Sequence, residues 1–245
     1  MLTHLLFLVA SVLAATGTVL LGKLDEPRNL KLVTAFTGAY MMGITCLHLM
    51  PEVFAHSQNK IKEADWQIGA FVLAGFFFQV ILENFSRGLE HGHRHETPSI
   101  LPFSMLAGLC LHAFLEAAPL GADASHEHGH THNTNLLLAA IVIHKYPVAI
   151  VLLAMLLQSA ISRPKAFLLL GVFTAMAPLG VLVGQISILT EYHHLLLAVV
   201  IGIFMHVSTT ILFESEEGHR FNLQKGIAII MGAVLAILSV TFSTH

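Results

Sequence analysis

Residues 105–121 read MLAGLCLHAFLEAAPLG, a segment that is hydrophobic enough to lie in a bilayer yet contains His112, Glu116 and Pro119. Residues four apart lie on one face of an α-helix, so the imidazole and the carboxylate are predicted to project to the same point. Ionisable groups in the hydrocarbon core are costly, and they commonly bind a ligand, face a cavity or relay protons. We interpret this pair as half of an intramembrane metal site, with a hydrogen bond between packed helices as the alternative.

The composition is typical of a polytopic membrane protein. Of 245 residues, 55% are hydrophobic and only 11% are charged, whereas soluble domains average about 25% charged residues. The lipid bilayer is therefore the expected surrounding, and the net charge of −3 gives no basis for a nucleic-acid partner. Cys46 and Cys110 fall inside hydrophobic segments, where they are expected to pack as small hydrophobic residues rather than to form a disulfide.

Eight hydrophobic segments divide the chain, each close to the roughly 20 residues that cross a bilayer. The sequence predicts an all-α fold in which residues 1–245 form a single domain of eight transmembrane helices. The first segment lacks a basic leader and a cleavage motif, so we interpret it as a span. The predicted spans are 2–22, 30–50, 66–86, 100–120, 135–157, 164–186, 193–214 and 225–243.

Basic residues in the loops predict the orientation. The loops after spans two, four and six hold only Lys60 and Lys62, and the other loops hold the nine residues Lys23, Arg28, Lys31, Arg87, Arg94, Arg163, Lys165, Arg220 and Lys225. The positive-inside rule then places the odd-numbered loops in the cytoplasm and both termini outside. The expected location is a plasma membrane or a bacterial inner membrane, and Lys145 is left over inside the fifth span.

The fifth span carries His144, Lys145 and Pro147 at intramembrane depth. Because consecutive spans run in opposite directions, a rise of about 1.5 Å per residue brings His144 to the level of His112. Proline in both helices frees backbone carbonyls, which is tolerated where the carbonyls line a cavity or find other partners. Broken helices that meet near the midplane are typical of transporters.

Other ionisable residues lie on the remaining spans. His48 and Glu52 form a second pair four residues apart at the predicted outer end of the second span, and His206 lies in the seventh. We interpret these three as entrance or pathway residues, although interfacial or structural roles fit them equally well. Gln79 and Glu83 lie toward the inner end of the third span.

Two loops are rich in histidine. Several imidazoles close together can capture a transition metal loosely, so we expect auxiliary metal capture, with the outer loop as a low-affinity collector. Loops that are merely soluble are the alternative. The predicted cytoplasmic loop 91–95 holds His91, His93 and His95, and the predicted extracytoplasmic loop 126–132 holds His126, His128, His130 and His132.

These motifs accumulate into a family resemblance. Over nearly its whole length the chain resembles the ZIP (Zrt/Irt-like) metal transporters. The matching segments are CLHLMPE at 46–52, HAFLEAAPLG at 112–121, HKYP at 144–147 and APLG at 177–180. The family patterns for the last three are H-N-x-x-[DE]-G, [HQ]-[DE]-x-P-[HE]-[ED] and E-P-x-G. The resemblance implies eight spans and one metal site made of His112, Glu116 and His144.

The chain departs from the family at the positions of a second, adjacent metal. Ala113 stands in place of Asn, Lys145 in place of an acid, Val148 in place of a bridging Glu and Ala177 in place of another Glu. We therefore predict one metal site without an identified fourth ligand. Lys145 is interpreted as a charge substitute for the second metal that partly neutralises Glu116. Its extension to the membrane interface is the alternative.

These observations predict a transporter rather than an enzyme. The expected activity is movement of Zn²⁺ into the cytoplasm by alternating access around the fourth and fifth spans. Two imidazoles and a carboxylate also suit Fe²⁺, Mn²⁺ or Co²⁺, and the metal is expected as the transported substrate, with no cofactor. An intramembrane zinc hydrolase, against which the lack of an HExxH motif counts, and a non-transporting metal sensor stay open. Assembly as a homodimer is also open.

Overall fold

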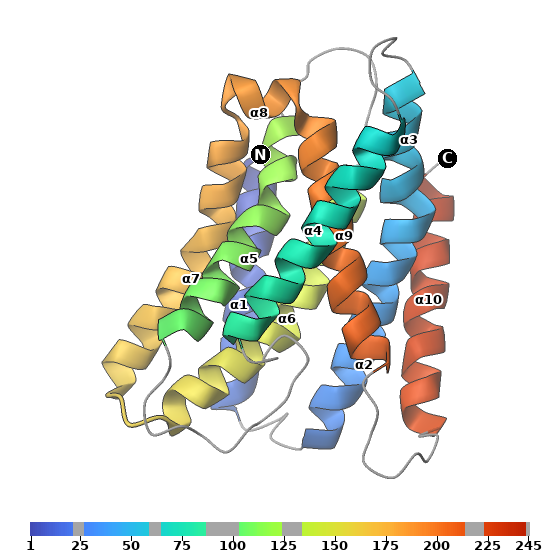
Figure 1. Cartoon of the computed structure of the whole chain (residues 1–245). Helices are drawn as coiled ribbons and strands as arrows, with labels where there is room; N and C mark the ends of the chain where they lie inside the picture. Colours follow the sequence, from blue (N-terminus) through green and yellow to red (C-terminus); the bar gives the residue numbers. More distant parts are fainter. Residues whose placement is uncertain (22–26, 59–64, 87–102, 124–133, 214–222, 244–245) are drawn as a thin grey trace.

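A computed structural model describes residues 1–21, 27–58, 65–86, 103–123, 134–213 and 223–243. Within these ranges all regular structure is helical, and eight helical spans are long and hydrophobic enough to cross a membrane. The long helices run side by side, and α1 begins at the same end of the bundle at which α10 ends (Figure 1). The predicted all-α bundle is confirmed, whereas the membrane side that each end faces stays a prediction.

Seven helices match the predicted spans to within a few residues, whereas the second span, predicted as 30–50, continues to Gln58. The second span consists of α2, a π-helical turn η1 and α3 in continuous succession, and the short helix α8 connects α7 to α9. The elements are α1 (Leu2–Leu20), α2 (Pro27–Ile44), η1 (Thr45–Leu49), α3 (Met50–Gln58), α4 (Asp65–Ser86), α5 (Phe103–Asp123), α6 (Thr134–Gln158), α7 (Arg163–Gly184), α8 (Ser187–Glu191), α9 (His193–Phe213) and α10 (Leu223–Ser243).

The π-helical turn η1 interrupts the second span at His48. Pro51 has no amide hydrogen, and in a regular α-helix its ring would clash with the carbonyl four residues earlier. A wider turn before the proline relieves this clash, and the Met50 amide donates to the Thr45 carbonyl, five residues earlier. The sequence analysis did not predict this turn, which sets the direction in which His48 projects.

Glycine lets three helix pairs approach backbone to backbone. A Cβ at Gly180 of α7 would overlap the Phe114 carbonyl of α5, and a Cβ at Gly202 of α9 would overlap the Val72 carbonyl of α4. Gly232 brings α10 equally close to α2. Close approach through small residues is the usual way in which membrane helices associate, since lipid provides no hydrophobic drive between them. The pairs α5/α7, α4/α9 and α2/α10 are thus tightly packed units.

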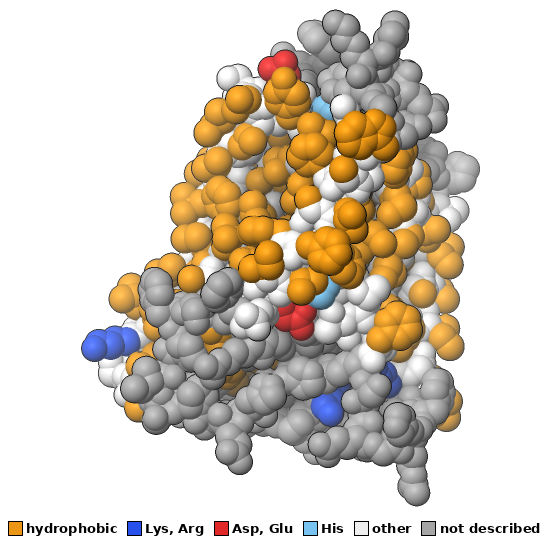
Figure 2. All heavy atoms as spheres, viewed as in Figure 1, with side chains coloured by type: hydrophobic (Ala, Val, Ile, Leu, Met, Phe, Trp, Pro, Cys, Tyr) orange, Lys and Arg blue, Asp and Glu red, His pale blue; other side chains and the backbone are white. Residues whose placement is uncertain are grey.

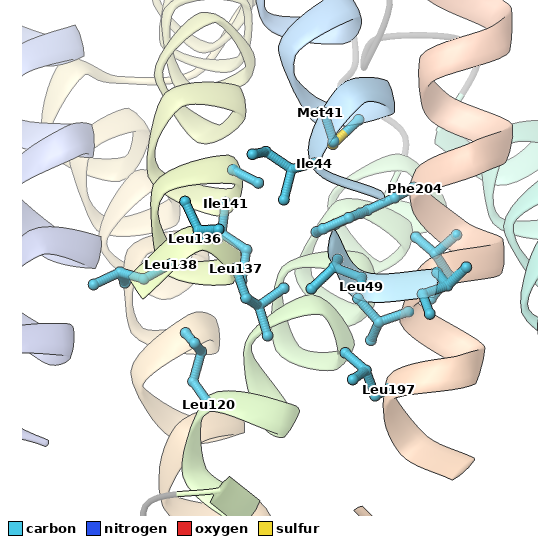
Figure 3. Close-up of a cluster of buried hydrophobic side chains, with 14 of the residues drawn as sticks. Met41, Ile44, Leu49, Leu120, Leu136, Leu137, Leu138, Ile141, Leu197 and Phe204 are labelled. Carbon is cyan, nitrogen blue, oxygen red and sulfur yellow. The ribbon is translucent and has the colours of Figure 1, made fainter. Parts of the chain in front are cut away.

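Buried hydrophobic side chains form two clusters along the bundle. The first, here the Leu120 cluster, joins Leu120 of α5 to the first half of α6 and to α9 (Figure 3). The second, here the Leu109 cluster, joins Leu109 of α5 to the second half of α6 and to α7. The ionisable residues His112 and Glu116 of α5 and His144 and Lys145 of α6 therefore lie in a polar layer between two hydrophobic ones.

The outside of the bundle is hydrophobic. Figure 2 shows mainly hydrophobic side chains on the face in view, with Lys and Arg toward one end and an adjoining acidic and histidine pair nearby. Large side chains such as Phe77 of α4, Leu168 of α7 and Ile230 of α10 are exposed. Such a surface is stable only in lipid, so the chain is an integral membrane protein.

Replacement of Gly180 by alanine tests the contact between α5 and α7. The added Cβ overlaps the Phe114 backbone, so the helices must separate, and we expect a loss of about 1–3 kcal/mol of stability. The measurement is the midpoint of thermal unfolding in detergent. Gly171→Ala on the same helix is the control, because beyond the adjoining backbone of α7 no described atom lies within 4 Å of its new Cβ. Equal midpoints for the two variants would contradict tight packing at Gly180.

Candidate functional site

His112 and Glu116 form the centre of the polar layer. Both lie on α5 and are buried, with 3% and 1% of their surface exposed. Their four-residue spacing puts them on one face of the helix, and His112 Nε2 lies 3.3 Å from Glu116 Oε2. The pair is therefore closed off from both lipid and solvent in this conformation.

Gln79 of α4 holds His112 from the opposite side. Its Oε1 atom lies 3.0 Å from His112 Nδ1, and its side chain is completely buried. With the Gln79 oxygen placed as the acceptor, Nδ1 is the donor and carries the proton. A neutral His112 then presents the lone pair of Nε2 toward Glu116, which is the tautomer that a metal ion would need.

This arrangement brings two electron-rich atoms face to face. The Nε2 lone pair and the carboxylate oxygen repel each other at 3.3 Å, and the low dielectric of the interior strengthens that repulsion. A positive charge between them removes the conflict. A proton on Nε2 supplies it by forming an ion pair, and a divalent metal ion supplies it by taking both atoms as ligands.

Lys145 of α6 supplies a second positive charge. Its Nζ lies 3.5 Å from Glu116 Oε1, and only 1% of the residue is exposed. The ammonium also lies 4.4 Å from the ring centroid of Phe173 of α7, which is a cation–π contact. In this structure Lys145 therefore points into the bundle and not toward the membrane interface.

His144 adjoins this group from α6. The residue is 1% exposed, and its ring stands edge-on to that of His112 with the centroids 6.0 Å apart. Within the described ranges no three His, Cys, Asp or Glu side chains lie close enough together to hold a metal ion as they stand. His112, Glu116 and His144 thus share one layer of the bundle, and their role as a ligand set stays a prediction.

Three of the positions at which the family has ligands for a second metal hold packed hydrophobic side chains in this protein. Ala113 and Val148 are buried in the Leu109 cluster, and Ala177 is buried in the Leu120 cluster. None of these side chains can bind a metal ion. Of the four positions 113, 145, 148 and 177, only position 145 therefore carries an ionisable side chain.

The second predicted pair lies nearer to the end of the bundle. His48 Nε2 is 3.4 Å from Glu52 Oε2, and both side chains are partly exposed. A cavity of about 20 Å³ lies beside Glu52 and is also lined by Pro119 of α5 and His193 of α9. This volume fits about one water molecule. It lies one turn of α5 from Glu116, and the sequence analysis did not identify His193.

His206 of α9 also has a partner that the sequence analysis missed. Its Nε2 contacts Oε2 of Glu83 on α4. The sequence feature that could have indicated Glu83 is its four-residue spacing from Gln79, which places both side chains on one face of α4. All seven histidines of the two loops lie outside the described residues, namely His91, His93, His95, His126, His128, His130 and His132.

Comparison with known proteins agrees with the resemblance in the sequence motifs. The family model described as ZIP Zinc transporter matches residues 90–239, more than half of the chain and including α5 to α9. Over 206 residues the chain is 25% identical to "Zinc transporter ZIP1" of Danio rerio. That match covers 66% of this chain and 66% of the relative, just under two thirds of the relative's length. The chain therefore belongs to the ZIP zinc transporter family.

Proposed function

We propose that this chain carries Zn²⁺, or a related divalent transition metal ion, across the membrane into the cytoplasm. The observation that carries the proposal is the buried pair of His112 and Glu116, whose Nε2 and Oε2 atoms lie 3.3 Å apart and are both of a type that binds transition metals. Family membership and the zinc transporter relative support transport rather than catalysis. His144 is the third proposed ligand, and these ligand types also accept Fe²⁺, Mn²⁺ and Co²⁺.

Binding of the ion is an exchange with Lys145 in this mechanism. Glu116 supplies the one negative charge of the proposed ligand set, and the Lys145 ammonium lies beside it. A divalent ion and an ammonium a few ångströms apart repel each other strongly in a low dielectric. The ammonium therefore leaves Glu116 as the ion arrives, and the His144 side chain turns toward the ion.

The two hydrophobic clusters lie between the proposed metal site and the ends of the bundle. The Leu120 cluster separates the polar layer from the end of the bundle that carries His48 and Glu52, and the Leu109 cluster separates it from the other end. An ion can reach and leave His112 only if these layers open in turn, which is alternating access. We expect the movement between the glycine-packed helix pairs, because separation within a pair would break backbone contacts.

Loss of the Glu116 charge tests the transport site. We expect Glu116→Gln to reduce Zn²⁺ uptake into proteoliposomes by at least about 10-fold, since even indirect changes at a metal site cost 10–100-fold. Glu191→Gln, at an exposed position on α8, is the matched control. The double variant Glu116→Gln/Lys145→Met shows whether an unpaired lysine, rather than the lost ligand, causes the effect. Undiminished uptake by Glu116→Gln would refute the proposed site, and wild-type protein that binds Zn²⁺ without uptake would be a sensor.

Gln79 is expected to act as a positioning residue for His112. Gln79→Leu removes the acceptor that fixes the tautomer of His112, so the apparent affinity for Zn²⁺ should fall about 10–100-fold. Gln79→Glu keeps an acceptor oxygen and should retain most of the affinity. Phe77→Leu, on the exposed face of the same helix, is the control. Equal affinities for Gln79→Leu and wild type would show that His112 is oriented by other contacts.

Lys145→Met tests whether the Lys145 ammonium and Zn²⁺ compete for Glu116. Removal of the ammonium leaves a buried carboxylate with less compensation, so the metal-free protein should unfold at a lower temperature. Zn²⁺ no longer competes with the ammonium, so its binding should tighten about 10-fold and its stabilising effect should grow accordingly. Lys165→Met, at an exposed position of α7, should change neither quantity. An unchanged Zn²⁺ affinity in Lys145→Met would contradict the exchange.

A further inference from the structure

Glu83 and His206 face each other across the packed pair of α4 and α9. Glu83 Oε2 contacts His206 Nε2 directly, and the two side chains are 23% and 11% exposed. We propose that these two residues form a second, weaker binding site for the divalent metal, on the path between His112 and the end of the bundle where α4 ends. This inference rests on the proposed transport function and adds a place where the ion pauses after it leaves the central site.

The helix backbones hold the two side chains in position. Gly75 of α4 and Gly202 of α9 each pack against the partner backbone so closely that a Cβ would overlap it. Gly202 lies one helical turn before His206, so the fixed contact is adjacent to the site. The Phe76 ring stands perpendicular to the His206 ring with the centroids 5.0 Å apart, which limits rotation of the imidazole. The site is therefore preorganised.

The surroundings of His206 indicate weak binding. Its Nδ1 atom is buried and makes no hydrogen bond to any of the residues that the structure describes. The hydroxyls of Thr209 and Thr210 donate to backbone carbonyls of α9, so they are already engaged within their own helix. A histidine that binds metal tightly usually donates its other ring nitrogen to an oxygen, as His112 does to Gln79. His206 lacks that support, which suits a site that must release its ion.

Helix α4 connects this site to the central one. Gln79 and Glu83 are four residues apart, which corresponds to about 6 Å along one face of a helix. Gln79 contacts His112, and Glu83 contacts His206. The exposed fraction rises from zero at Gln79 to 23% for the Glu83 side chain, so the line of polar groups leads outward from the core. Glu83 and His206 are the two ligands that the described residues offer here, and water would complete the coordination.

The first experiment counts bound ions. The parent protein has the seven loop histidines replaced by serine, and bound Zn²⁺ is measured by equilibrium dialysis of the purified full chain. We expect Glu83→Gln and His206→Phe each to remove one weakly bound ion while the tightly bound ion stays. Glu116→Gln should instead remove the tight ion and leave the weak one. Unchanged numbers of bound ions in Glu83→Gln and His206→Phe would overturn the inference.

The second experiment separates binding from packing. Cysteine at position 206 is smaller than histidine but binds soft metals well, and a Cd²⁺–thiolate bond absorbs in the ultraviolet. His206→Cys should therefore gain a Cd²⁺-dependent absorption above the background of the two native cysteines, whereas Val207→Cys should not. Addition of Glu83→Gln to His206→Cys should weaken this binding. Equal absorption from the two cysteine variants would overturn the inference.

Transport measurements distinguish failure of this inference from failure of the proposed function. In proteoliposomes His206→Phe should lower the maximal rate of Zn²⁺ uptake about 10-fold with little change in the apparent KM, and His206→Cys should restore much of it. Wild-type uptake together with an unaltered maximal rate in His206→Phe overturns the inference alone. Absence of uptake by the wild type overturns the transport function, and the binding counts still decide whether Glu83 and His206 hold an ion.

Discussion

The negative charge of Glu116 inside a hydrophobic bundle is the constraint on which the centre of this structure depends. A carboxylate moved from water into a protein interior costs several kcal/mol unless nearby cations and donors compensate it. His112 contributes from one turn away on α5, and Lys145 contributes from α6. Gln79 of α4 in turn holds His112. One carboxylate thus ties three helices together, and a change of the cation beside it affects all three.

The replacement of the second metal position by lysine changes the charge balance of the transport cycle that we propose. With Ala113, Val148 and Ala177 packed among hydrophobic side chains, Glu116 and Lys145 form an ion pair, and with a neutral His112 this layer carries no net charge. A neutral layer crosses a low-dielectric region at a much smaller electrostatic cost than a charged one. In the proposed cycle, the conformational change without a bound ion therefore has a low electrostatic cost. The same change with a bound ion moves a net positive charge.

Local features of this protein were predictable from sequence, and contacts between distant segments were not. Hydrophobic length predicted the eight spans, and the four-residue spacing predicted that His112 and Glu116 share a helix face. Gln79 and His112 are 33 residues apart in the chain, and Glu83 and His206 are 123 apart, so their pairing depends on how α4 packs against α5 and α9. The η1 turn likewise depends on how the bundle accommodates Pro51. Loop charges predicted an orientation, which stays a prediction.

His112 and His206 each contact a residue of α4, and their surroundings favour metal binding of different strength. A site that binds its ion strongly enough to extract it from water must also let it go, and successive sites of decreasing strength accomplish both. His112 is oriented by a buried amide and faces a carboxylate in a closed layer, which favours tight binding. His206 meets its carboxylate where water has partial access, and among the described residues its Nδ1 has no hydrogen-bond partner. In the transport path that we propose, an ion that leaves His112 has a second carboxylate within reach before it is fully hydrated, because one turn of α4 separates the two partner residues.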